Sequence, residues 1–305
     1  GAKQSFQKAR ALKKAVAFFV GKLDSSHAHF YRVISSLVAN YGAVICPVVI
    51  PYIENDEVKS YIDLITNKAY ACDGLELKEL RMPLSNEADE MRSMLLEAIA
   101  TADDALMEKY FAGEEFTPEE IIEGLKKGVT AGEICPVFAG VQQTGAAVPL
   151  MVDTLLQILP SAADAVCRFE DGEEKAFDEN GENALFVFKT IADPFVGKLS
   201  YFRVLSGKIK NDTRLINNRT GAEERLSKIM WLKGGKQEDA GEIIAGDIGS
   251  VSKLGNVLTG DTLSVSGKLA AAAVDFPAPT ISVAVYPKAK GDEEKITQAF
   301  SRLCE

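Results

Sequence analysis

The stretch that decides the fold is residues 185–263, which read LFVFKTIADPFVGKLSYFRVLSGKIKNDTRLINNRTGAEERLSKIMWLKGGKQEDAGEIIAGDIGSVSKLGNVLTGDTL. Short apolar runs alternate there with turn residues. The first run ends at Asp193-Pro194, and the second ends at Ser206-Gly207. No helical period interrupts the series. Short strands separated by regular turn signals are typical of an all-β barrel or sandwich, so this stretch predicts one.

Composition limits the class of protein. A chain of 305 residues has room for two or three domains. Its net charge is −10, so a general basic face is absent and any contact with RNA must be local; DNA is not an expected partner. The cysteines are odd in number and form no CxxC pair, which favours neither a zinc site nor a disulfide framework. No signal peptide opens the chain, and no apolar run reaches the roughly 20 residues of a membrane helix, so we expect a cytoplasmic protein.

The first half of the chain alternates strands and helices. Continuous apolar runs at residues 15–20, 44–50 and 135–140 predict buried parallel strands. Residues 30–41 and 148–159 carry helical apolar periods. Together they predict an α/β sheet domain over residues 1–160.

Residues 52–131 predict an insertion into this domain. Short strands are expected around Thr66-Asn67 and Asp73-Gly74, and one long helix over residues 86–111. Thr117-Pro118-Glu119-Glu120 has the pattern of a capping box with proline at the first helical position, so another helix should begin there.

The second half predicts a β-barrel domain over residues 161–275 and the start of a third unit over residues 276–305. In that unit Phe276-Pro277 opens the segment, Ile281, Val283 and Val285 alternate as a strand should, and residues 292–304 predict a helix.

Five pieces of the second half carry a family resemblance. They are Asp193-Pro194, Gly197-Lys198, Arg203-Val204 with Ser206-Gly207, Ala245-Gly246-Asp247-Ile248-Gly249 and Thr259-Gly260-Asp261-Thr262-Leu263. In this order and spacing they resemble the second domain of translational GTPases, most closely elongation factor G. The layout of residues 1–160 is similar to the C-terminal half of that family's GTP-binding domain, with its insertion, and residues 276–305 resemble the start of its ferredoxin-like third domain. As chemistry, the five pieces are expected to be barrel turns only.

The resemblance implies a guanine site after the first strand, at the carboxyl end where open α/β sheets bind ligands. The family has Asn-Lys-x-Asp where this chain has Gly21-Lys22-Leu23-Asp24. In that motif the Asp accepts two hydrogen bonds from guanine, the Lys stem packs on the ring, and the Asn anchors the neighbouring loop and the purine edge. Lys22 and Asp24 match, but Gly21 has no side chain, so weaker base recognition is expected. A strand end followed by a helix cap at Asp24 or Ser25 explains the same residues.

A second motif also departs from the family pattern. Gly140-Val141-Gln142 stands where the family usually has Gly-Ser-Ala, whose last backbone N–H meets guanine O6. Val141 and Gln142 therefore belong to the candidate site, and Gln142 is expected to crowd the base. The two histidines, His27 and His29, are two residues apart and face different directions on a helix, so neither a metal site nor a catalytic role is expected.

A local basic concentration lies on and beside the predicted barrel turns. The resemblance implies that this domain contacts small-subunit ribosomal RNA, and the candidate residues for phosphate contacts are Lys208, Lys210, Arg214, Arg219, Arg225 and Lys228. Solvated rims of the barrel explain these residues equally well.

The resemblance implies a fragment of an elongation-factor-G-like translation factor. Its full-length parent is expected to bind GTP or GDP with Mg²⁺ and to act in ribosomal translocation. No G-x-x-x-x-G-K-[ST] phosphate loop occurs in this sequence, so the chain alone is expected to hold no nucleotide and to be inactive as a GTPase. Two alternatives stay open: a degenerate paralogue that binds the ribosome without GTPase activity, and a ribosomal protection protein of the tetracycline-resistance type.

Overall fold

The structure is a computed structural model that describes residues 1–193, 197–274, 276 and 278–303. Three predicted features, at Pro194, Pro277 and Cys304, lie outside the described residues. The chain divides into two compact units, Gly1–Pro160 and Ser161–Glu305, and each is described by itself.

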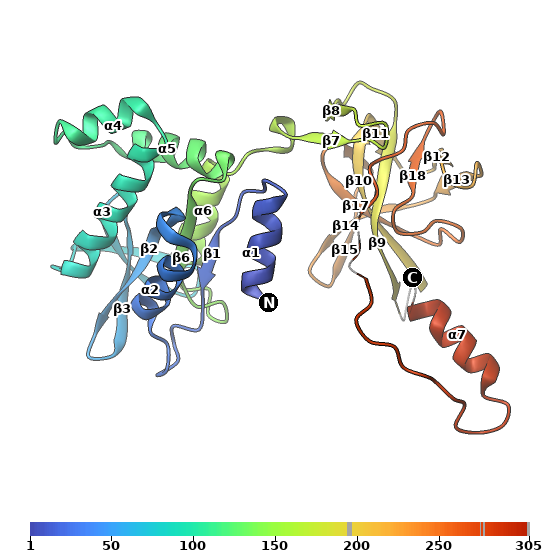
Figure 1. Ribbon diagram of the computed structural model, residues 1–305, viewed down its shortest axis with the longest axis horizontal. Helices are drawn as coiled ribbons and strands as arrows, with labels where there is room; N and C mark the ends of the chain where they lie inside the picture. Colours follow the sequence, from blue (N-terminus) through green and yellow to red (C-terminus); the bar gives the residue numbers. More distant parts are fainter. Residues whose placement is uncertain (194–196, 275, 277, 304–305) are drawn as a thin grey trace. The chain divides into compact units, whose positions relative to one another are not determined.

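The first unit is built on one six-stranded sheet, with strand order β1-β6-β2-β3-β4-β5 (Figure 1). The strands are β1 (Phe18–Val20), β2 (Ile45–Glu54), β3 (Glu57–Asp63), β4 (Lys68–Asp73), β5 (Glu76–Leu80) and β6 (Cys135–Ala139). β1, β6 and β2 run parallel, as the apolar runs predicted. The prediction of a buried first strand was wrong in one respect. Among the described strands β1 is the edge of the sheet, and Phe19 is 37% exposed.

The insertion extends this sheet instead of forming a sheet of its own. β3 pairs antiparallel with β2, and β4 and β5 continue the series through tight turns at Asn67 and Gly74. The predicted long helix is two helices, α3 (Asn86–Thr101) and α4 (Asp104–Phe111). The break has a clear cause, because the Asp103 carboxylate accepts hydrogen bonds from the backbone N–H groups of Ala105 and Leu106 and so starts a new helix.

The remaining helices of the unit pack around the sheet (Figure 1). They are α1 (Ala2–Ala11), α2 (Phe30–Tyr41), α5 (Pro118–Ala131) and α6 (Val148–Ile158). The predicted capping box is confirmed at the start of α5, where Thr117 and Glu120 exchange side-chain and backbone hydrogen bonds. Phe30, Ile50 and Phe138 are fully buried in the core between sheet and helices.

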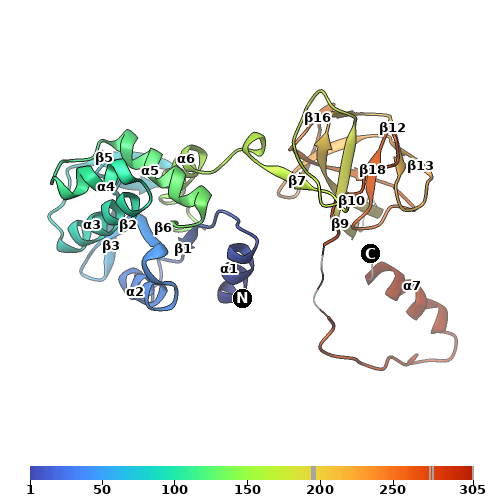
Figure 2. The same ribbon diagram turned by 45° about the horizontal axis from the view of Figure 1, so that its top comes forward.

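The second unit is built of β-strands between Val166 and Ser264, as predicted, and its main sheet has eight antiparallel strands in the order β13-β12-β18-β9-β10-β17-β14-β15. The view in Figure 2 shows these strands curving around a common interior. The bounds are β9 (Ala184–Asp193), β10 (Gly197–Ser206), β12 (Thr213–Asn217), β13 (Glu223–Leu226), β14 (Ile229–Lys233), β15 (Lys236–Asp239), β17 (Ile248–Ser252) and β18 (Thr262–Ser264). No described strand pair joins β13 to β15, so the sheet is a half-barrel that stays open along that line.

Two short ribbons complete the second unit. They are β7 (Val166–Arg168) with β8 (Glu174–Ala176), and β11 (Lys208–Lys210) with β16 (Glu242–Ile244). The interior is tightly packed: a Cβ on Gly249 would collide with Ile243 and lie 2.9 Å from the Phe202 ring. A side chain at that point of β17 would have to displace Ile243 and the Phe202 ring.

The C-terminal segment matches its prediction only in part. The helix is present as α7 (Glu293–Leu303), but the described residues 278–287 form no strand. Ile281 and Val283 are 79% and 78% exposed. A strand needs a partner for its backbone N–H and C=O groups, and the described chain provides none for this segment.

Candidate functional site

The structure brings the two base-site motifs together, although they lie 120 residues apart in the sequence. The loop that follows β1 meets the loop that follows β6, because these strands are parallel neighbours and end at the same edge of the sheet. The Gly140 N–H donates to the carbonyl of Val20 at 3.2 Å. Across this junction the backbone N–H of Lys22 donates to Oε1 of Gln142 at 3.1 Å.

Gln142 lies over Gly21. A Cβ built on Gly21 would be 2.6 Å from Gln142 Oε1 and 3.2 Å from the Phe19 ring. The side chain of Gln142 thus occupies the space that a side chain at position 21 would need. We expected Gln142 to crowd the base; in the structure its amide is bonded to the Lys22 backbone.

Lys22 has an unusual backbone conformation. Its φ is +58°, in the left-handed region that residues with a Cβ seldom adopt. Both of its backbone polar groups are satisfied, since its N–H donates to Gln142 and its C=O accepts from the N–H of Ser25 at 3.1 Å. Such conformations persist where the surroundings hold them, and they cluster at ligand sites.

Asp24 is not a helix cap. α2 begins at Phe30, its N-cap is His29, and no side chain caps it, so the explanation of Asp24 or Ser25 as the cap of this helix was wrong. The Asp24 carboxylate is exposed and takes part in no hydrogen bond or ion pair within the described residues. Burial, and then the nearby Cys72 and Asp24, raise the pKa of Tyr61 to about 12. Asp24 therefore lies close enough to Tyr61 to disfavour ionisation of the phenol. The oxygens of Asp24 are free for a ligand.

The inserted strands support the second loop. The backbone N–H of Val141 donates to the carbonyl of Ala146 at 3.0 Å and closes the loop into a compact turn. Gly145 has a φ of +84°, and a Cβ there would lie 2.7 Å from Leu75 in the turn between β4 and β5. Val141 itself is buried and contributes to the core of the first unit. The position of Gln142 is thus fixed from two sides.

These residues carry groups that can contact a base, but none that form a phosphate site. A carboxylate at Asp24, a lysine stem at Lys22 and an amide at Gln142 can meet the polar edge and the face of a base. A phosphate site needs several converging backbone N–H groups and a lysine, and the 305 residues contain no sequence of that kind.

The six basic candidates on the half-barrel are all paired with carboxylates, at N–O distances between 2.5 and 3.2 Å. The pairs are Lys208–Glu179, Lys210–Glu242, Arg214–Glu223, Arg219–Asp261, Arg225–Asp212 and Lys228–Asp239. The predicted basic rim is therefore balanced by acidic neighbours. In five of the pairs both side chains are exposed, so water and salt screen them and they open easily.

Arg219 differs from the other five. Its Nε and Nη2 donate to both oxygens of Asp261 at 2.7 and 2.9 Å, and Nη2 also donates to the carbonyl of Asn256 at 2.8 Å. Asp261 is only 4% exposed and also accepts from Asn217 and from the Leu258 N–H. Burial acts to raise the pKa of Asp261, but these hydrogen bonds hold it below its usual value. Arg219 is thus a clamp between turns of the half-barrel, and its role as an RNA contact stays a prediction.

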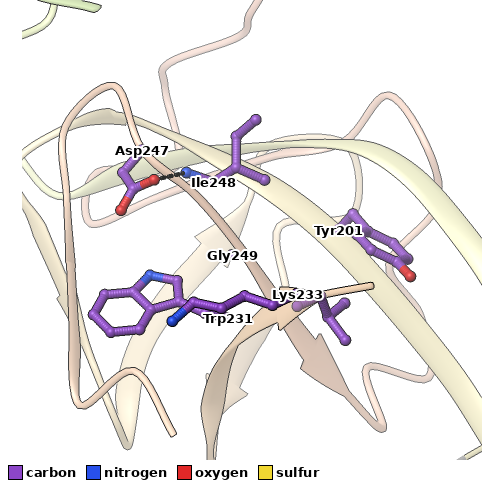
Figure 3. Close-up of a pocket in the computed structure, with 7 residues that line it drawn as sticks. Tyr201, Trp231, Lys233, Asp247, Ile248 and Gly249 are labelled. Atoms are coloured by element: carbon purple, nitrogen blue, oxygen red, sulfur yellow. Dashed lines mark hydrogen bonds between the residues drawn. The ribbon is translucent and has the colours of Figure 1, made fainter. Parts of the chain in front are cut away.

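The cavity shown in Figure 3 is lined by residues of β10, β14 and β17 of the half-barrel and has a volume of about 670 Å³. Tyr201, Trp231 and Ile248 give it an apolar lining, and Asp247 accepts the Ile248 N–H at 2.7 Å. Trp231 packs against the core of the half-barrel and also lines this cavity. The lining has no cluster of groups suited to catalysis.

Two further findings concern the described residues alone. No group of three or more His, Cys, Asp or Glu side chains there is arranged to hold a metal ion. None of the helices in that part of the chain is long and apolar enough to cross a membrane.

Comparison with known proteins shows which protein family the half-barrel resembles. Residues 182–266 match the family model described as elongation factor G domain 2. The crystal structure of a protein from Thermus thermophilus is similar to 99% of this chain, with a TM-score of 0.79 and 26% sequence identity. The match covers 44% of that protein, so the present chain spans less than half of its length.

Proposed function

Because this chain belongs to the elongation factor G family of translational GTPases, we propose that it is part of a translation factor that binds the small ribosomal subunit through the half-barrel and serves in translocation. The observation that carries this proposal is the match of residues 182–266 to the family's second domain. In this family that domain meets ribosomal RNA.

The ion pairs define how such a contact would form. With a net charge of −10 the chain has no long-range attraction to RNA. Lys208 and Lys210 can exchange their exposed carboxylate partners for phosphates, because neither partner is buried. Arg214, Arg225 and Lys228 can do the same, whereas Arg219 would have to leave the buried Asp261. The five exposed pairs are thus the proposed RNA contacts.

The nucleotide part of the function rests on the base site. Lys22, Asp24, Val141 and Gln142 would hold the guanine of GTP or GDP, and the phosphates and Mg²⁺ would need residues outside this sequence. GTP, when bound, supplies the phosphoryl group for hydrolysis; this chain's own residues would only hold and select the base. A paralogue without GTPase activity is the second candidate, and Gly21 is the residue that favours it.

Sedimentation with purified ribosomal subunits tests the proposal. We expect the chain to pellet with small subunits and not with large ones at low salt. With two or three phosphate contacts, its affinity should fall about tenfold between roughly 50 and 200 mM salt.

Charge-reversal variants identify the contact. The variant Lys208→Glu with Lys210→Glu should lose the binding seen at low salt. Lys59→Glu with Lys68→Glu is the matched control, since it makes the same charge change at two exposed, paired lysines of the first unit. Binding that is unaffected by salt and by both double variants would overturn the proposal.

A further inference from the structure

Position 21 of the base site has no side chain, and the side chain of Gln142 occupies the space beside it. Gly21 provides no side chain, and the amide oxygen of Gln142 lies where a Cβ of residue 21 would have its closest neighbour, 2.6 Å away. A larger residue at position 21 and a glutamine at position 142 would therefore compete for one volume. The absence of a side chain at Gly21 thus leaves room for the side chain of Gln142 from the other loop.

The orientation of the Gln142 amide follows from its partner. A backbone N–H can only donate, so the group that receives the Lys22 N–H at 3.1 Å must be the oxygen of the amide. The nitrogen Nε2 then lies on the other branch of the same amide. Within the described residues nothing accepts its two hydrogens, and Gln142 is exposed.

We propose that Gln142 takes over both tasks of the missing side chain at position 21: its oxygen anchors the Lys22 loop, and its nitrogen donates to the edge of a purine base held by Asp24. This inference rests on the base site of the proposed function. It assigns the specificity of that site to a residue of the second loop.

The anchoring task follows from the conformation of the loop. Lys22 is held at a φ of +58°, which is costly for a residue with a side chain, and Gln142 accepts the one backbone donor of that residue. Loss of the amide leaves the Lys22 N–H to solvent. The loop that carries Asp24 then loses this hydrogen bond to the loop after β6, and only the bond from Gly140 to Val20 remains at the junction.

The recognition task follows from the donors and acceptors present. The Asp24 carboxylate accepts hydrogen bonds only, which suits the N1–H and the 2-amino group of guanine. The Gln142 nitrogen donates, which suits the O6 acceptor next to N1–H or the N7 acceptor of the same base. Adenine has no N1–H and carries an amino group in place of O6, so the site should prefer guanine.

Two variants at position 142 separate the tasks. Gln142→Glu keeps an oxygen for the Lys22 N–H but cannot donate to a base, whereas Gln142→Ala loses both functions. Amide hydrogen exchange of Lys22, followed by NMR, reports the anchor. We expect exchange about 2- to 10-fold faster in Gln142→Ala and unchanged in Gln142→Glu. Equal exchange rates in the wild-type chain and Gln142→Ala would overturn the anchoring role.

Binding of GMP, with AMP as the competing probe, reports recognition. In NMR titrations up to about 20 mM, GMP should shift the resonances of Lys22, Asp24 and Gln142 with a dissociation constant in the millimolar range. AMP should bind more weakly. The GMP affinity should fall about 5- to 10-fold in both Gln142→Ala and Gln142→Glu. No shifts with GMP, or equal affinities in Gln142→Glu and the wild type, would overturn the recognition role.

A rescue variant tests the exchange itself. Gly21→Asn alone must displace the Gln142 side chain, so its GMP affinity should not exceed that of the wild-type chain. In Gly21→Asn combined with Gln142→Ala the space is free, and GMP affinity should return to within about twofold of the wild type. A double variant no better than Gln142→Ala would contradict the exchange. Ribosome sedimentation is independent of all these readouts, so failure of the proposed function and failure of this inference are distinguishable.

Discussion

The clamp formed by Arg219 and Asp261 gives a sharp prediction about the stability of the half-barrel. Arg219→Ala removes two charged hydrogen bonds, of 2.7 and 2.9 Å, from a carboxylate that is 4% exposed. Breaking a buried ion pair from one side costs about 3–5 kcal/mol. The Arg219 side chain is itself 45% exposed, so water reaches part of the vacated space, and we expect a loss of about 2–3 kcal/mol in the free energy of unfolding.

The matched control is Arg225→Ala. Arg225 carries the same side chain and pairs with Asp212, but both partners are exposed, at 58% and 60%. Its removal should cost less than about 1 kcal/mol. The contrast between the two variants isolates the burial of the acid partner.

Urea unfolding followed by tryptophan fluorescence measures the difference in unfolding free energy between the two variants, and it does so for the half-barrel. Trp231 is the single tryptophan of the chain, and it belongs to β14 of the half-barrel. With a urea dependence of about 2 kcal/mol per molar, Arg219→Ala should lower the midpoint by about 1 M or more. Equal midpoints for the two variants would refute the clamp.

Three further predictions concern stability and reactivity. Asp103→Ala should destabilise the first unit by about 1 kcal/mol in urea unfolding followed by circular dichroism, because it removes the cap of α4; no change would show that the cap is dispensable. The half-barrel should lose stability as the pH falls below about 4, because the pKa of Asp261 is lowered in the folded state and the unfolded chain binds its proton first; this loss should be smaller in Arg219→Ala, and equal pH profiles would contradict it. Cys46 and Cys135 should resist thiol reagents until the first unit unfolds, because burial raises the pKa of both thiols; mass spectrometry of the native chain would reveal early labelling if this were wrong.

Local sequence signals predicted the type of many elements, although not which elements pair. The capping box at Thr117, the apolar runs of the parallel strands and the turns between the strands of the half-barrel can each be recognised in a short stretch of sequence. The break between α3 and α4 was also encoded locally, in Asp103, but the apolar stripe that continues through it hid the cap. A strand at Ile281 was expected from its alternating pattern alone, and a pattern does not supply a partner strand.

The chemistry of the candidate sites depends on distant pairs, which spacing does not reveal. Gln142 reaches Lys22 across 120 residues, and Arg219 reaches Asp261 across 42. The sequence indicated a local cluster of basic residues on the half-barrel. It did not reveal their carboxylate partners, because these pairs form only in the folded sheet. A single sequence gives the residue types at such a site, but the fold decides which of them remain available to a ligand.

Chemical probing of ribosomal RNA is the most direct test of whether the half-barrel binds the small subunit. Small subunits are treated with a base-modifying reagent and with hydroxyl radicals at low salt, with and without saturating chain. We expect protected nucleotides in small-subunit RNA with the wild-type chain and with Lys59→Glu/Lys68→Glu, and none with Lys208→Glu/Lys210→Glu. The absence of any protection by the wild-type chain, or protection that survives reversal of Lys208 and Lys210, would contradict it.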